Sequence, residues 1–310
     1  MINRLLSTLK KQFQSKTTDP HYDDYQGQDI EASAVTKELE KVTTPVETET
    51  VGYSSPLIKV GYGLSSGKQR THNEDAFFTL TTMFSFNESE IPFGLYIVAD
   101  GMGGHKNGEI ASELAIRTIV GFVLTEIFTP MMSLNPQPSE MSYREVFHSG
   151  IEKANAEILK SSYGGGTTVT AVLIVGEQMT IAHVGDSRVY SVDTEGNLEA
   201  LTRDHSLVKR LQELGQITPE EAAVHPQRNV LYRALGQGDP FEPEIISTSR
   251  PDKGSLLICS DGLWSILTQE VISEIIKSGT SPQQITDRLI DASNDAGGPD
   301  NISAIFVEIS

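Results

Sequence analysis

Hydrophobic and polar residues follow two periods along most of the chain, and both predict regular elements from about residue 57 onward. Strict alternation predicts a half-buried strand whose apolar positions are Ile58, Val60, Tyr62 and Leu64. A more continuous apolar run predicts a second strand over residues 93–99. Helical spacing then predicts one helix over residues 108–128 and another over residues 143–160, with a proline-containing break between them.

The second half of the chain alternates groups of strands with pairs of helices. Strands are predicted over residues 168–175, 179–185, 188–192, 198–201, 244–249, 255–259 and 302–309. Two helices are predicted near residues 268–277 and 282–292, the second opened by Ser281 as cap and Pro282 as first position. Neighbouring strands joined by short turns, with helices in pairs between them, predict an α+β fold of antiparallel sheets with helices on their faces.

The first 50 residues differ from the rest in charge and in apolar content. Residues 1–16 carry four basic residues and no acid, with apolar side chains at helical spacing at Ile2, Leu5, Leu6, Leu9 and Phe13. Residues 17–50 hold nine acids against two lysines, a composition typical of a disordered linker. Two interpretations of the basic start stay open: a helix that binds a membrane surface or a partner, and a frayed terminus without a function.

Composition excludes several classes of protein. A formal net charge of −18 argues against a nucleic-acid partner, because such binding depends on Lys and Arg. The single cysteine, Cys259, permits no intramolecular disulfide and no thiolate metal cluster, and its apolar neighbours predict a buried structural residue. No signal peptide or transmembrane segment is apparent from the apolar runs, so we expect a cytoplasmic monomer.

Acidic turns stand beside the predicted strands. Aspartates with Gly, Ser or Asn as the next residue occur at Asp100, Asp186, Asp261 and Asp300, and a fifth acidic turn ends in Glu74 and Asp75. Hard divalent cations such as Mg²⁺ and Mn²⁺ prefer carboxylate and carbonyl oxygens. The recurrence of such turns predicts a metal site.

Each of these turns also has a structural explanation when taken alone. Asp-Gly at residues 100–101 and 261–262 is ordinary turn chemistry, Asp186 can bond nearby backbone, and Asp300 can cap a loop. The glycine run at residues 164–166 could belong to a phosphate-binding loop. It lacks the Lys-Ser/Thr ending and leads into a strand, which favours a flexible turn.

Eight short motifs occur together in one order over residues 57–310. They are RTHNED at 70–75, DGMGGH at 100–105, GGTT at 165–168, VGDSR at 184–188, RDHS at 203–206, YRALG at 232–236, SDGL at 260–263 and GPDN at 298–301. This set resembles the bacterial branch of the metal-dependent protein phosphatase (PPM) family. The resemblance implies an α-β-β-α sandwich, two antiparallel sheets flanked by helix pairs, with residues 51–310 as the catalytic domain and residues 1–50 as a tail.

The resemblance also implies a metal centre with two Mn²⁺ or Mg²⁺ ions. Asp100 would bridge the ions, the Gly101 carbonyl would bind one of them, and Asp261 and Asp300 would complete a shell. Asp75 would also be a metal ligand, acting largely through a water. Glu74 and Asn301 would be supporting residues, with Glu74 likewise acting largely through waters. Asp186 is the expected ligand of a possible third, weaker ion.

Substrate binding and proton transfer follow from the same resemblance. Arg70 offers a planar guanidinium to two phosphate oxygens. Met102 stands where many eukaryotic relatives carry a histidine, and a thioether cannot protonate a leaving alcohol. His105 and a metal-bound water are the two candidate general acids. His183 and His205 are expected to be structural, and residues 205–228 resemble the variable flap beside the active site.

The function implied is hydrolysis of phosphoserine and phosphothreonine in proteins by a water that bridges two ions, without a covalent intermediate. The natural partner of such an enzyme is a Ser/Thr kinase whose products it hydrolyses. Two alternatives remain at this point: a phosphatase for a small phosphoester on the same metal site, and an inactive relative that serves as a binding module.

Overall fold

Two five-stranded antiparallel sheets form the centre of the computed structural model, which describes residues 58–86, 89–103, 106–134, 140–161, 164–238 and 241–310. One sheet has the order β1-β12-β11-β8-β9, with bounds Ile58–Ser65, Ile302–Ile309, Gly254–Cys259, Arg188–Val192 and Leu198–Ala200. The other has the order β10-β7-β6-β3-β2, with bounds Glu244–Ser249, Gln178–Val184, Val169–Val175, Ser89–Ala99 and Ala76–Phe86. The expected tail, with its basic start, lies outside the described residues.

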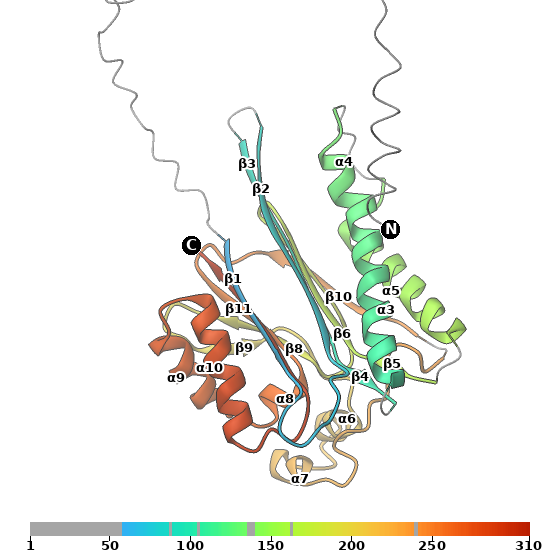
Figure 1. Cartoon of the computed structure of the whole chain (residues 1–310), viewed down its shortest axis with the longest axis vertical. Helices are drawn as coiled ribbons and strands as arrows, with labels where there is room; N and C mark the ends of the chain where they lie inside the picture. Colours follow the sequence, from blue (N-terminus) through green and yellow to red (C-terminus); the bar gives the residue numbers. More distant parts are fainter. Residues whose placement is uncertain (1–57, 87–88, 104–105, 135–139, 162–163, 239–240) are drawn as a thin grey trace, which may run out of the picture. The chain divides into compact units, whose positions relative to one another are not determined.

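Helix pairs cover the outer faces of the two sheets (Figure 1). Helices α3 (Lys106–Val123) and α5 (Tyr143–Lys160) pack on the sheet that contains β3 and β6. Helices α9 (Gln269–Ser278) and α10 (Pro282–Asp295) pack on the sheet that contains β11 and β12. The α-β-β-α sandwich predicted from the motifs is therefore confirmed.

The alternation of side chains along β3 divides its apolar residues between two cores. Leu95 and Ile97 point toward α3 and α5, whereas Tyr96 and Val98 pack between the sheets against residues such as Ile258. This period of two is what a strand covered on both faces requires. Because both faces of the strand are buried, its sequence is nearly continuous in apolar residues.

The first long helical segment continues past its predicted end at residue 128 by three residues, into the predicted break. A π-helical turn, Leu124–Phe128, and a short helix, Thr129–Met131, extend α3, and Pro130 is tolerated because it lies in the first turn of that last piece. The run Asn107–Met131 is long and apolar enough, by length and composition alone, to cross a membrane. Its buried positions pack in the core against α5 and the sheet, at Ala111, Ala115, Ile119, Val123 and Ile127.

Strands β2, β4 (Gly101–Met102) and β5 (Gly166–Thr167) and helix α6 (Leu207–Glu213) fall outside the sequence predictions. Strand β2 forms the edge of its sheet and pairs with β3 along its whole length. A two-stranded ribbon pairs β4 with β5. Helix α6 opens the flap, followed by α7 (Pro219–Ala223), whose predicted Thr218 cap is present.

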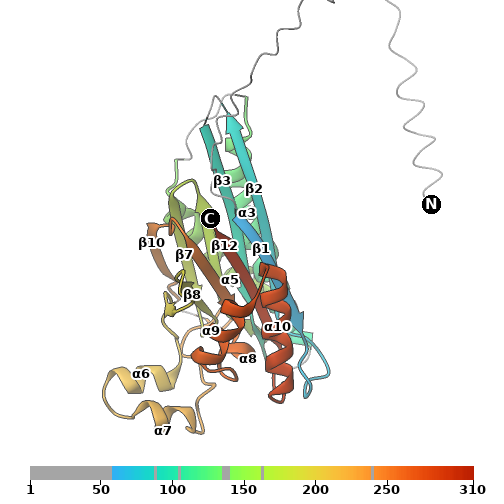
Figure 2. The same cartoon turned by 90° about the vertical axis from the view of Figure 1, so that its left-hand side faces the viewer.

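The flap extends from one end of the sandwich (Figure 2). Its two ends pair with each other, because Ser206 and Leu231 form an isolated antiparallel bridge. The Leu207 amide donates to the Val230 carbonyl at 2.8 Å, and the Tyr232 amide donates to the His205 carbonyl at 2.9 Å. The helices α6 and α7 therefore stand on a closed two-stranded stem.

Gly61 and Gly121 provide a matched test of this packing. A Cβ at Gly61 in β1 would lie 2.2 Å from the backbone of Pro282, whereas a Cβ at Gly121 in α3 would meet nothing within 4 Å. We expect Gly61→Ala to lower the free energy of unfolding by about 1–3 kcal/mol and Gly121→Ala to raise it by roughly 0.5–1 kcal/mol. Chemical denaturation measures both changes, and equal effects would contradict the close approach of α10 to β1.

Candidate active site

The predicted acids gather at one end of the sandwich, on loops that follow or precede strands. Asp75 precedes β2, Asp100 follows β3, and Asp186 lies between β7 and β8. Asp261 begins the short helix α8 (Asp261–Trp264) directly after β11, and Asp300 lies just before β12. Antiparallel pairing brings these loops together, since Ala76 opposes Ala99 and Cys259 opposes Ala304.

A cavity of about 220 Å³ lies among these loops, and we call it the acidic cavity. Its walls contain most of the residues that the sequence predicted for the site: Arg70, Glu74, Asp100, Gly101, Asp186, Asp261 and Asp300, together with Met102, Gly103, Thr168, Asn229 and Leu231. Asp75 and Asn301 are buried and do not line it. His105 lies outside the described residues.

Asp100 is held by Thr167 and Thr168, the two threonines of the GGTT motif. Its amide donates to Thr168 Oγ1 at 3.0 Å, and its carbonyl accepts from the Thr168 amide at 2.8 Å and from Thr167 Oγ1 at 2.9 Å. All these bonds use the backbone of Asp100. The Asp100 carboxylate is therefore fixed in place without a neighbouring threonine occupying its oxygens.

Asp75 is buried with one carboxylate oxygen bonded and the other not. Ser303 and Ser260 donate hydroxyl hydrogen bonds to Oδ2 at 2.6 Å and 2.8 Å. Oδ1 is buried and has no hydrogen-bond partner among the described residues. Burial raises the pKa of Asp75 to about 7, against the effect of the serine hydrogen bonds. A buried carboxylate oxygen without a partner suits a cation or a water bound to one.

The other acids raise one another's pKa values. Burial, and then the charges of Asp75 and Asp261, hold the pKa of Asp100 well above its ordinary value. Burial and Asp261 do the same for Asp186, and burial and Asp300 raise the pKa of Asp261 to about 6. Like charges in a buried site cannot all ionise without a compensating cation.

One arginine supplies part of that compensation. The Arg70 guanidinium contacts Asp300 at 2.9 Å at the rim of the cavity. One monovalent cation does not balance this many carboxylates, so the donor set fits divalent ions. The described residues hold no group of three or more His, Cys, Asp or Glu side chains already close enough to bind an ion. Waters would therefore have to complete the shell, as is usual for Mg²⁺.

Asn301, just before β12, is bonded to three points of the loop between β1 and β2. Its Oδ1 accepts the Glu74 amide at 2.8 Å, while its Nδ2 donates to the carbonyls of His72 and Ser66 at 2.9 Å and 3.0 Å. Every one of these partners is a backbone group. Asn301 thereby fixes the path of the chain that carries Glu74 and Asp75 through bonds to backbone groups alone.

Glycine at position 101 is required by the close approach of three backbone segments. In the structure, a Cβ at Gly101 would lie 2.4 Å from the Gly108 carbonyl oxygen and 2.5 Å from that of Glu74. The Gly101 amide also donates to the Glu74 carbonyl at 3.2 Å. Close backbone contact with its neighbours therefore demands glycine here.

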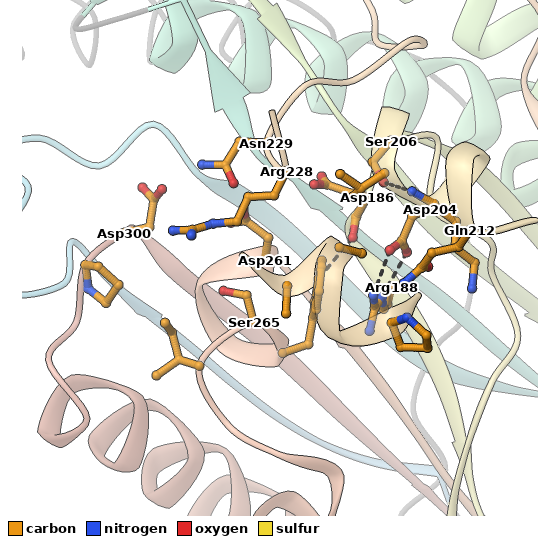
Figure 3. Close-up of a pocket in the computed structure, with 18 of the residues that line it drawn as sticks. Asp186, Arg188, Asp204, Ser206, Gln212, Arg228, Asn229, Asp261, Ser265 and Asp300 are labelled. Carbon is orange, nitrogen blue, oxygen red and sulfur yellow. Dashed lines mark hydrogen bonds and ion pairs between the residues drawn. The ribbon is translucent and has the colours of Figure 1, made fainter. Parts of the chain in front are cut away.

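An arginine cluster, formed by Arg188, Asp204 and Trp264, connects the turn of Asp186 to the flap. Figure 3 shows Arg188 and Asp204 side by side. The Arg188 guanidinium donates to both Asp204 oxygens at 2.9 Å and 2.7 Å, and it lies 3.3 Å from the centre of the Trp264 ring. The Trp264 indole in turn donates to the Asp186 carbonyl at 3.0 Å. Sequence reasoning missed this cluster, because its members are distant in the chain.

The two histidines near the flap serve as hydrogen-bonded core residues, as predicted. His183 is buried between Thr170 Oγ1 and the Arg203 carbonyl, and burial lowers its pKa to about 4. The Gly185 amide donates to His205 Nδ1 at 3.1 Å. Burial, together with the neighbouring His183, lowers the pKa of His205 to about 3. Neither imidazole lines the acidic cavity.

Comparisons with known proteins agree on one family. The family model described as protein phosphatase 2C matches residues 61–302. Protein phosphatase PhpP of Streptococcus pneumoniae is 35% identical over 250 residues, which cover 79% of this chain and 94% of PhpP. A serine/threonine phosphatase of S. agalactiae has a TM-score of 0.68 and 31% identity, covering 82% of this chain and 100% of its own. The catalytic domain of the phosphatase PstP, solved with two manganese ions, has a TM-score of 0.66 and 28% identity, covering 82% and 99%.

The raised pKa values predict how the metal-free protein responds to pH. Between about pH 4 and pH 7, the folded state holds protons that the unfolded state has already released. Without metal, we therefore expect the free energy of unfolding to fall from pH 5 to pH 7.5 by on the order of 1–3 kcal/mol. Denaturation in a chelator measures this slope, and Asp186→Asn should reduce it, whereas Asp252→Asn in an exposed turn should not. A flat profile in the wild type would contradict the account.

Proposed function

Because the chain belongs to the protein phosphatase 2C family, we propose that it is a metal-dependent phosphatase that hydrolyses phosphoserine and phosphothreonine in proteins. The observation that carries the proposal is the acidic cavity, where buried carboxylates raise one another's pKa values and one arginine stands at the rim. The names of the matched relatives, which are protein and serine/threonine phosphatases, support the same reaction.

The metal ligands that we propose are those whose oxygens face or border the cavity. Asp100 would bridge two ions, with the Gly101 carbonyl, Asp261 and Asp300 completing the shells. Asp75 would contribute its unpaired oxygen, directly or through a water. The manganese ions in the PstP structure support Mn²⁺ or Mg²⁺ as the cofactor. When bound, two such ions supply a water of lowered pKa as nucleophile and neutralise the phosphate oxygens.

The remaining residues of the site act on the substrate or on the ligands. Arg70 has a guanidinium that is more than half exposed, and it can turn from Asp300 to two phosphate oxygens. Glu74 and Asn301 would hold the first acidic turn in position. Since Met102 cannot donate a proton, the leaving alcohol would take one from a water in the site or from His105. We favour the water.

We also propose the extent of the catalytic domain and the setting in which it acts. Residues 51–310 would be the catalytic domain, active as a monomer in the cytoplasm against proteins phosphorylated by a Ser/Thr kinase. The family match, which spans residues 61–302, supports the extent of the domain. The complete set of acids argues against an inactive binding module, since such a protein has no need for buried carboxylates of raised pKa.

The bridging role of Asp100 can be tested by removing one charge. We expect Asp100→Asn and Asp261→Asn to lower manganese-dependent turnover of a phosphothreonine peptide by at least ~100-fold, because even supporting residues of metal sites cost 10- to 100-fold. Chelation should stop the wild type, and added Mn²⁺ should restore it. Asp252→Asn is the matched control. Full activity of either site variant at saturating Mn²⁺ would contradict the assignment of two ions to these residues.

The metal dependence of an Asp186 variant tests whether Asp186 binds a third ion in addition to the two-ion centre. Asp186 is buried, and the nearby charge of Asp261 helps to raise the pKa of Asp186. This proximity suits a third ion that shares Asp261. Such an ion would have few protein ligands and low affinity. Asp186→Ala should retain two bound ions by metal analysis, yet lose much of its turnover on phosphopeptide. An unchanged manganese titration and maximal rate would remove Asp186 from the site.

A further inference from the structure

A second, larger cavity of about 720 Å³ continues from the acidic cavity to the flap (Figure 3), and we call it the flap groove. The two cavities share five lining residues, Arg70, Asp186, Asn229, Asp261 and Asp300. A volume of this size is typical of sites that enclose a drug-sized ligand. It exceeds what a single phosphate group requires, so the groove has room for residues next to the phosphorylated side chain.

Four cations line the flap groove, and two of them are already paired. Arg70 contacts Asp300, and Arg188 is bound by Asp204. The side chains of Lys209 and Arg228, by contrast, form no ion pair with any carboxylate in the part of the chain that the structure describes. The groove therefore offers two available positive charges in a protein whose formal net charge is −18.

The lack of a partner for Lys209 does not follow from a shortage of acids nearby. Glu213 lies four residues later on α6, at the spacing that allows an ion pair with Lys209. Glu213 instead contacts Arg203 and Arg210. Helix α6 thus has its own acid occupied by other arginines, and Lys209 remains available to the groove.

Arg228 extends into the groove on the side of Asp261 and Asp300, whereas Gln212 lies on the side of Arg188 (Figure 3). Arg228 and Lys209 line the flap groove but not the acidic cavity, while Arg70 lines both. The two free cations therefore lie next to the position of the reacting phosphate and not at it. Apolar side chains complete the wall at Val208, Ala222, Trp264 and Ile266.

We propose that the flap groove binds the peptide next to the phosphorylated residue, and that Arg228 and Lys209 bind an anionic side chain of that peptide. The anion would be the carboxylate of Glu or Asp or the phosphate of a second phosphorylated residue, since a guanidinium and an ammonium bind both. The groove thereby selects acidic or multiply phosphorylated substrates. This inference rests on the proposed phosphatase function and names the substrate class of that site.

The test compares phosphothreonine peptides that are identical except at one neighbouring position, which is neutral, Glu or phosphoserine. The position is varied on both sides of the phosphothreonine, and kcat/KM is measured with saturating Mn²⁺. We expect the wild type to prefer anionic peptides by about 4- to 20-fold, since each partly exposed ion pair contributes roughly 2- to 5-fold. The preference should shrink at high ionic strength, because salt screens exposed charges.

Variants assign the preference to the two cations. Arg228→Gln and Lys209→Gln should each reduce the ratio of kcat/KM between anionic and neutral peptides, and the double variant should bring it close to one. Arg228→Glu should invert the preference toward a peptide with a neighbouring lysine. Arg210→Gln, in the same helix but paired with Glu213, is the matched control and should keep the wild-type ratio. Thermal melts of each variant check that the fold is retained.

Three outcomes would overturn the inference. One is a wild type that does not distinguish anionic from neutral peptides. Another is an equal loss on all peptides in Arg228→Gln, which would assign Arg228 to the reacting phosphate. The third is a ratio that survives in the double variant. The Glu and phosphoserine peptides separate the two sources of the anion. Failure of the phosphatase proposal itself would differ, because the wild type would then hydrolyse none of the peptides with Mn²⁺.

Discussion

Mutual repulsion among buried carboxylates is the constraint on which the rest of this structure depends. Asp75, Asp100, Asp186 and Asp261 lie at one end of the sandwich, and burial together with their neighbours raises all four pKa values. The chain supplies hydrogen bonds to hold this arrangement and directs most of them to backbone groups. Threonine holds Asp100 and asparagine holds the loop of Glu74, so carboxylate oxygens stay available for cations.

The two sheets make this arrangement possible by bringing distant segments to the same edge. The register of β2 on β3 places Asp75 beside Asp100, and that of β11 on β12 places Ser260 beside Ser303. The hydroxyl of Ser303 in β12 and that of Ser260, just after β11, then donate to the same oxygen of Asp75. A sandwich with a well-packed layer between its sheets can hold such loops rigidly, which a metal site requires. The site is thus a product of strand register.

Much of the fold and the choice of the acids could be predicted from the sequence, because both depend on local signals. Alternating apolar residues marked β1, and the Ser281-Pro282 pair marked the start of α10. Strand β2 was missed, since an edge strand with Thr and Ser among its apolar residues lacks a clear period. The arginine cluster and the free state of Lys209 could not be predicted. Both depend on which residues become neighbours after folding, and a single sequence does not give those pairings.

The closed stem of the flap has a consequence for how such enzymes diversify. Ser206 pairs with Leu231, so the chain leaves and re-enters the sandwich at almost one point. Asp204 lies just before the stem and is held by Arg188, so this ion pair lies outside the flap. The segment between the two ends is therefore a modular insertion. Exchange of this module would change the lining of the flap groove and the Asn229 side of the acidic cavity, while the aspartates of the cavity stay in place on the sandwich.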